Sequence, residues 1–303
     1  MATTAISKGN KGLQRAQART AYVLCLPALI FIAIFIILPF SMSVIYSFTD
    51  RMLVQRAGKA VEFTGLANYI KVLTNSTSQK AFRNTAIYAV MVVPAIVVLG
   101  TVLAVYVNRQ LRGVKIFRAI YFSPQVVTMT VVAVVWSFIF SPGSTGLLNS
   151  FLGLFGIKAQ TWLSDPKWAL ACIAIMFIWQ SLGLQMIIIL GGLQYIPEEL
   201  YEAALLDGCN SVQKFFYVTI PLLRNTMVYV LVSVTISTLK LFTQVYVLTN
   251  GGPQNATVSV VYLLYKVGFL NNQLGYSSAI AVVFFLIVMI ISLIQNFLIR
   301  ERD

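Results

Sequence analysis

The sequence predicts an all-α membrane protein with six transmembrane helices, and three observations support this fold class. The chain is 58% hydrophobic and only 10% charged, whereas a soluble domain carries about 25% charged residues. Six apolar runs are each long enough to cross a hydrocarbon core, which takes roughly 20 helical residues. A short acidic segment, residues 196–221, separates the fourth run from the fifth.

The chain begins with a polar tail, residues 1–20, and continues as one six-span domain, residues 21–303. The first apolar run, residues 21–48, is far longer than a signal-peptide core of roughly 7–15 residues. We therefore interpret it as a retained span with a kink near Pro39. The other expected spans are residues 85–107, 119–140, 168–190, 216–242 and 279–298. Prolines predict further kinks, which neighbouring helices can tolerate, at Pro94, Pro124 and Pro221.

Composition excludes several classes of function. The net charge is +13, but no long basic run or basic helix face occurs, so we expect no nucleic-acid partner. The three cysteines, Cys25, Cys172 and Cys209, form no disulfide or metal-binding pattern, and histidine is absent. No Gly-x-x-x-x-Gly-Lys-Ser/Thr loop occurs, so ATP is not expected to bind this chain in the way of P-loop proteins. These absences favour a transport subunit over an enzyme, with no cofactor or metal in this chain.

The acidic segment is predicted to form a short helix that ends in a sharp turn. Pro197 suits the first position of a helix, and carboxylates in the first turn complement the helix dipole. Gly208 can adopt the left-handed conformation that ends a helix. Four of the nine carboxylates of the chain lie here: Glu198, Glu199, Glu202 and Asp207.

A second helix is expected to begin directly after the turn and to enter the membrane. Asn210 can cap it, with Gln213 three residues further on. Ala203 and Ala204 would give the acidic helix a flat patch that the backbone of another protein can approach. The alternative interpretation of this segment is an ordinary amphipathic loop helix.

The spacing of this segment resembles a known motif. Glu202-Ala203-Ala204, three residues, Gly208, nine residues and then Val218-Thr219-Ile220-Pro221 resemble the EAA loop of ABC-importer permeases. In that family, the loop is a cytoplasmic coupling helix that seats in a cleft of the ATPase subunit. The resemblance implies that the following residues couple this chain to an ATPase: Glu198, Glu202, Ala203, Ala204, Asp207 and Gly208.

Four weaker segments extend the resemblance to the sugar-type subfamily, the maltose and glycerol-phosphate importer class. They are residues 65–69, 117–124, 141–149 and 244–253. This resemblance implies a permease for a carbohydrate, polyol or glycerol-phosphate-like solute. It also implies a second related permease, two ATPase subunits that bind ATP and Mg, and an extracytoplasmic solute-binding protein. The expected location is the cytoplasmic (inner) membrane of a bacterium or archaeon, in contact with lipid.

Topology follows from parity and charge. Six spans place both termini on one side, and basic residues in both tails and in the loop between spans two and three favour a cytoplasmic location. The loop between spans one and two also holds six basic residues, which argues the other way. The coupling helix decides the orientation, because docking to an ATPase places it, and hence both termini, in the cytoplasm.

Polar residues within spans four and five are the candidates for the substrate path, because such groups tend to face a cavity. The candidates are Trp179, Gln180, Ser181, Ser237, Thr238 and Lys240, with Gln185 also noted. Interhelical hydrogen bonding is the alternative role for the polar side chains. Lys240 either snorkels to the interface or faces an anionic solute.

The family resemblance places sugar contacts on the same two spans. The corresponding positions are Ile178, Gln180 and Ser181, and Val234, Ser237, Thr238 and Leu241. Three of these are apolar, so this chain is expected either to contact substrate lightly or to leave the site to a second permease.

Two other classes of function stay open at this point. An ion-gradient-driven secondary transporter is the main alternative, although no Asp or Glu lies within the six expected spans, which argues against proton coupling. A membrane enzyme is the weaker one, because histidine and buried acids are lacking.

Overall fold

The computed structural model describes residues 2–55, 58, 60–108 and 113–299. Over these residues the chain is helical, with one isolated antiparallel bridge between Thr49 and Phe63. Five of the described helices are long and apolar enough to cross a membrane, and a bent pair of helices makes six when the pair is taken as one span. The predicted six-span, all-α fold is therefore confirmed.

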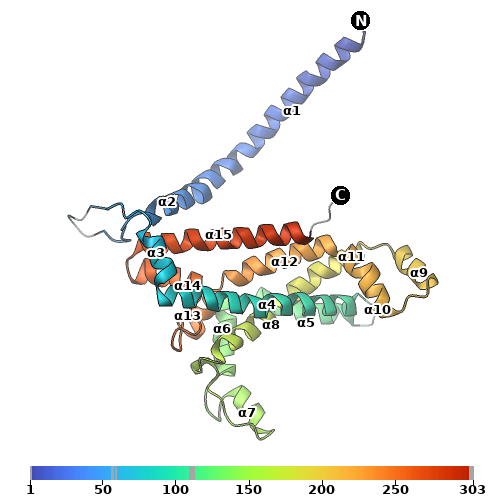
Figure 1. The fold of residues 1–303 in the computed structure, drawn as a ribbon. Helices are drawn as coiled ribbons and strands as arrows, with labels where there is room; N and C mark the ends of the chain where they lie inside the picture. Colours follow the sequence, from blue (N-terminus) through green and yellow to red (C-terminus); the bar gives the residue numbers. More distant parts are fainter. Residues whose placement is uncertain (1, 56–57, 59, 109–112, 300–303) are drawn as a thin grey trace.

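The first span is a helix with a π-helical segment in the middle. It comprises α1 (Ala2–Ile32), the π-helical segment Ala33–Ile37 and α2 (Leu38–Ser47). Pro39 lies in the first turn of α2, where its missing amide hydrogen removes one bond of the helical ladder. The apolar part of this span is not buried by the rest of the chain, and α1 projects away from the other helices (Figure 1).

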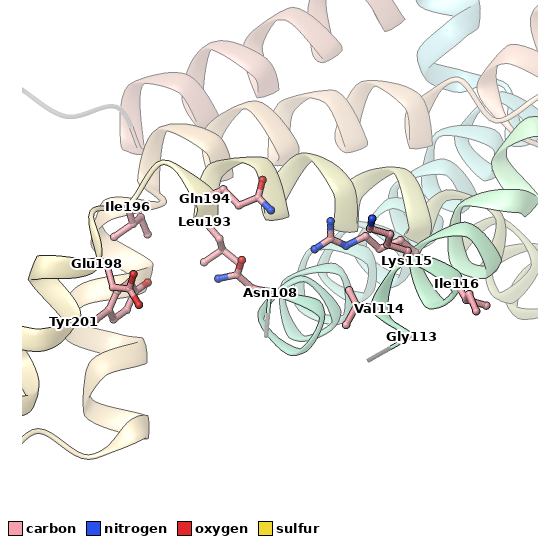
Figure 2. Close-up of a pocket in the computed structure, with 11 residues that line it drawn as sticks. Asn108, Gly113, Val114, Lys115, Ile116, Leu193, Gln194, Ile196, Glu198 and Tyr201 are labelled. Carbon is pink, nitrogen blue, oxygen red and sulfur yellow. The ribbon is translucent and has the colours of Figure 1, made fainter. Parts of the chain in front are cut away.

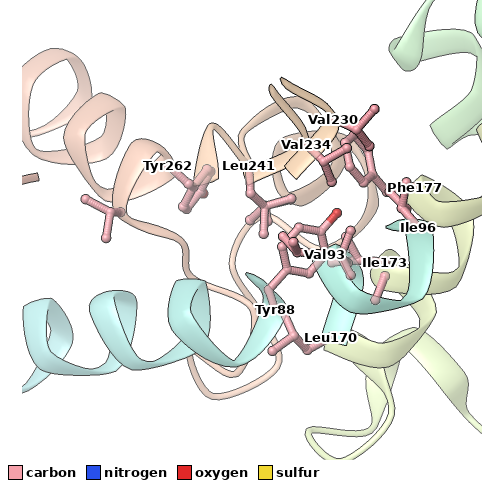
Figure 3. Packing of buried hydrophobic residues seen from close by; sticks show 14 of the residues in the cluster. Tyr88, Val93, Ile96, Leu170, Ile173, Phe177, Val230, Val234, Leu241 and Tyr262 are labelled. Carbon is pink, nitrogen blue, oxygen red and sulfur yellow. The ribbon is translucent and has the colours of Figure 1, made fainter. Parts of the chain in front are cut away.

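The other spans form a bundle in which α12 contacts three of its neighbours. The bundle contains α4 (Ser76–Val107), α8 (Ala169–Gln194), α12 (Arg224–Leu239) and α15 (Leu274–Ile299). Helix α8 packs against α4, and α12 contacts α4, α8 and α15. Figure 3 shows the centre of this packing, where Tyr88 and Ile96 of α4 lie near Ile173 and Phe177 of α8. Pro94 lies within α4, which continues unbroken.

The third span is broken rather than kinked. We expected a kink at Pro124, but Pro124 lies inside α5 (Val114–Val126), and the chain turns by 99° before α6 (Met129–Ile139). The break begins at Val127, whose backbone is extended. Its carbonyl oxygen accepts a hydrogen bond of 2.9 Å from Nε2 of Gln180 on α8. A side chain of another span therefore satisfies a backbone group that the break leaves free.

The fifth span begins later than expected. The sequence suggested residues 216–242, whereas the membrane-crossing segment is Arg224–Leu248. Pro221 cannot donate a helical hydrogen bond, and the chain before Arg224 is a run of short helical segments. These are α10 (Ser211–Lys214), the π-helical segment Phe215–Thr219 and α11 (Ile220–Leu222).

Short elements gather at the two ends of the bundle. Helix α9 (Glu198–Leu206) and α10 lie at one end in Figure 1, and the connecting helices of the other end lie opposite. The latter are α3 (Ala67–Thr74), α13 (Thr243–Leu248), α14 (Val260–Tyr265) and the π-helical segment Lys266–Leu270. A hairpin with α7 (Leu147–Gly153) and the 3-10 turn Trp162–Ser164 extends from α6.

Candidate functional site

The bounds of helix α9 are set by residues at its own two ends, as the sequence indicated. It begins one residue later than expected, because Pro197 is the N-cap and not the first helical residue. Glu198 and Glu199 occupy the first turn as predicted. Gly208 has a φ of +77°, so the predicted left-handed turn is confirmed. This conformation is strained for residues with a side chain, which explains the glycine.

The second helix of the loop has the predicted cap. Oδ1 of Asn210 accepts a 2.9 Å hydrogen bond from the amide of Gln213. Oε1 of Gln213 accepts a 2.8 Å bond from the amide of Asn210. This reciprocal capping box fixes the direction in which the chain leaves the turn.

The loop is attached to the base of span five. Hydroxyl groups of Tyr201 and Thr219 lie 3.1 Å apart, and α9 packs on the π-helical segment that contains Thr219. Ala204 is only 8% exposed, so it faces its own chain and is not part of the outward patch that we expected. The other five predicted coupling residues are all exposed: Glu198, Glu202, Ala203, Asp207 and Gly208.

A partly polar cavity opens at the side of the bundle, and we call it the polar cavity. Its volume is about 430 Å³, and it opens between α4, the break of span three, α8 and α12. Three of the predicted path residues line it: Gln180, Ser181 and Ser237. The family-aligned position Val234 lines it as well.

Two glutamines give this cavity its hydrogen-bonding character. Gln180 is 5% exposed and Gln185 is 7% exposed, and both line the cavity. Among the described residues, neither Oε1 atom has a hydrogen-bond partner. Buried carbonyl oxygens without a donor are costly, and both belong to residues that line the cavity.

Three other predicted residues are placed elsewhere in the described structure. Trp179 is 47% exposed, and its ring centroid lies 5.6 Å from that of Trp136. Thr238 is buried next to Ser237 on a different face of α12, since successive helical residues point about 100° apart. Lys240 is exposed at the C-cap of α12. None of the three is among the residues found to line the polar cavity.

Sequence reasoning missed two polar residues of the cavity. Gln125 and Thr128 line it from the break in span three. Their signal was Pro124, which marks an irregular backbone, and irregular backbone at membrane depth occurs where it lines a cavity or is buried in protein.

Comparison with known proteins agrees with this architecture. Residues 61–302 match the family of binding-protein-dependent transport system inner membrane components. The lactose transport system permease protein LacF of Rhizobium radiobacter is 31% identical, with 100% of both chains covered. The trehalose/maltose transport system permease protein MalF of Thermococcus litoralis is 33% identical over 91% of this chain and 92% of that protein.

A solved structure shares the fold. It is a bacterial alginate ABC transporter in complex with alginate pentasaccharide-bound periplasmic protein. The matching chain is 21% identical and superposes with a TM-score of 0.80 over 96% of both chains.

The chain therefore belongs to the family of binding-protein-dependent transport system inner membrane components. It is a multi-pass membrane protein and a permease subunit, not an enzyme. This assignment removes the secondary transporter and the membrane enzyme from consideration.

Proposed function

We propose that this chain is one permease subunit of an ATP-driven importer for a carbohydrate or polyol. Relatives named for lactose and for trehalose/maltose transport support the substrate class. In this proposal, an extracytoplasmic binding protein delivers the solute, and two partner ATPase subunits bind ATP and Mg. This chain needs no cofactor of its own.

The observation that carries the proposal is the connection between the acidic loop and the cavity. Helix α9 rests on the π-helical segment Phe215–Thr219 through Tyr201 and Thr219. That segment leads through α11 into α12, which carries Ser237 at the cavity wall. A π-helical turn is a common site of functional bending. Movement of an ATPase docked on α9 would therefore reach the cavity through the backbone.

The lining of the cavity favours a neutral solute. Its described lining residues include no charged side chain, and the amide and hydroxyl groups of its polar lining residues can hydrogen-bond sugar hydroxyl groups. Lys240, the candidate partner of an anionic solute, lies outside this lining. We therefore favour a neutral polyhydroxylated solute, with Gln180, Gln185, Ser181 and Ser237 as contacts.

The arrangement of the helices also supports the proposed orientation. The carboxyl end of α15 lies at the same end of the molecule as α9 (Figure 1). A cytoplasmic α9 thus places the end of α15 in the cytoplasm too, and an even number of spans then places the amino terminus there. The unburied apolar surface of span one is free to face lipid acyl chains or a second permease.

Two substitutions on the acidic loop test the function. Glu202→Lys reverses an exposed charge, and Gly208→Asp places a side chain at a positive φ. We expect both variants to reach the membrane, to lose uptake at least about tenfold, and to hydrolyse ATP without responding to substrate. Uptake and substrate-stimulated ATPase activity are measured in membrane vesicles that contain the partner subunits.

Matched controls come from the opposite end of the molecule. Gly156 has a φ of +74° and open space around it, so Gly156→Asp imposes the same backbone strain away from α9. Glu62→Lys reverses another exposed charge. Wild-type uptake and substrate-stimulated ATPase activity in both loop variants would contradict the proposal. An equal loss of uptake in the two control variants would contradict it as well.

A further inference from the structure

A second cavity lies beside the acidic loop and has no part in the transport path described above. Its volume is about 870 Å³, and it opens between the beginning of α5, the end of α8 and α9. Figure 2 shows Val114 and Lys115 on one side, and Glu198 and Tyr201 on the other. A ligand bound here would touch both the membrane-spanning helices α5 and α8 and the acidic loop.

The α5 side of this cavity is positively charged. Lys115 and Arg118 both line it. Nη2 of Arg118 donates to the carbonyl oxygen of Val107, the last residue of α4, over 3.3 Å. Nε of the same side chain is buried and, in the described part of the chain, has no hydrogen-bond partner. A buried guanidinium N–H without an acceptor is costly, and the guanidinium of Arg118, which lines the cavity, is a group that binds oxyanions strongly.

The backbone adds to this attraction for anions. Gly113 precedes α5 and provides no side-chain cap for the amides of the first turn. A helix of 13 residues carries partial positive charge at that end, where phosphate groups commonly bind. Among the described lining residues, two are cationic and one is acidic, so their summed charge is positive and the acidic side chain lies on α9.

An exposed apolar strip leads away from the cavity along α5. Ile116 lines the cavity and is 68% exposed, and Ile120, one turn further along, is 61% exposed. Phe117 beside them is also exposed. An acyl chain can cover such a strip while its headgroup stays at the end of the span, which favours a lipid over a free anion.

We propose that this cavity binds the phosphate of an anionic phosphoglyceride headgroup from the leaflet in which α9 lies. The phosphate contacts Lys115, the guanidinium of Arg118 and the first amides of α5. The hydroxyl groups of a glycerol headgroup point toward Glu198, which can accept their hydrogen bonds. Basic pockets between spans at a membrane surface suit such headgroups. The bound lipid links α5 to the acidic loop.

Lipid retention tests the proposal on the full-length chain. The protein is reconstituted in nanodiscs with equal amounts of phosphatidylglycerol and phosphatidylcholine of the same acyl composition, and retained lipids are identified by native mass spectrometry. We expect wild type to prefer phosphatidylglycerol. Lys115→Glu and Arg118→Gln should each reduce that preference about tenfold, the effect of losing one charge-assisted hydrogen bond.

The controls separate a structural effect from lipid recognition. Arg118→Gln also removes the bond to Val107, whereas Lys115 is exposed, so Lys115→Glu should keep the melting temperature. Lys158→Glu changes an exposed lysine on the α7 hairpin and should keep the preference. An unchanged preference in Lys115→Glu would overturn the proposal.

Two further measurements identify the occupant of the cavity. Inorganic phosphate is added to the nanodiscs at millimolar concentration, and loss of the preference would assign the site to a free anion instead of a lipid. The chain purified together with its ATPase partner should retain the lipid. Its loss on assembly would mean that a protein side chain fills the cavity, which would also overturn the proposal.

Discussion

Two buried glutamines of α8, Gln180 and Gln185, line the polar cavity. Nε2 of Gln180 donates a hydrogen bond to the carbonyl oxygen of Val127. Its Oε1 has no hydrogen-bond partner among the described residues. Gln185, little more than one turn further, also has an unpartnered Oε1. Gln180 thus both stabilises the broken backbone of span three and lines the cavity. A substitution of Gln180 would therefore change folding and solute binding together.

Gln185 allows a cleaner test of the cavity. Gln185→Met keeps the volume of the side chain and removes the acceptor, so we expect the KM for uptake to rise about tenfold with normal membrane abundance. Thr238→Val removes another buried, unpartnered oxygen that is not among the residues lining the cavity, and should leave KM unchanged. Lys240→Gln should likewise preserve uptake. Equal effects of the three substitutions in radiolabelled uptake assays would contradict the assignment of the cavity.

At the scale of the elements, α8 is the helix against which its neighbours are positioned. Its Gly183 allows the backbone of α5 to come close, because a Cβ atom there would lie 1.9 Å from the carbonyl oxygen of Tyr121. Small residues at helix contacts serve this purpose in membranes, where packing replaces the hydrophobic effect as the driving force. The position of α5 decides where Gln125 meets the cavity.

A single methyl group should disturb this contact. Gly183→Ala forces α5 away from α8, and we expect it to destabilise the protein by about 1–3 kcal/mol, the usual cost of overpacking. Gly191→Ala is the matched control on the same helix, since nothing lies within 4 Å of its added Cβ. Thermal unfolding in detergent compares the two variants. Equal melting temperatures would show that α5 does not depend on Gly183.

The elements also show what sequence can predict and why. The turn at Gly208 and the cap at Asn210 follow from neighbouring residues, and both were predicted correctly. The break at Val127 depends on a side chain from another span, which local patterns do not specify. For the same reason the cavity was only partly predicted: Gln180 and Ser237 stood out as polar residues in apolar spans, whereas Gln125 needed the break to be known.

At the scale of the whole molecule, the proposed orientation places α9 and α10 in the cytoplasm and the α6–α7 connection outside. Thr145 on the α6–α7 connection and Val212 on α10 are both exposed. After replacement of Cys25, Cys172 and Cys209, a cysteine at Thr145 should react with an impermeant thiol reagent added outside intact cells. A cysteine at Val212 should react only after permeabilisation. The reverse labelling pattern would invert the proposed orientation and remove α9 from the cytoplasm.

The central claim is that α9 docks on an ATPase subunit, and crosslinking within one helix tests it most directly. Ala203 is exposed, whereas Ala204 is 8% exposed and faces its own chain. In the cysteine-free background, Ala203→Cys should form a crosslink to the copurified ATPase subunit with a short thiol-to-amine reagent, and the crosslink should change in yield when ATP is added. Ala204→Cys should form little or none. No crosslink from Ala203→Cys, or equal crosslinking from both positions, would contradict the account.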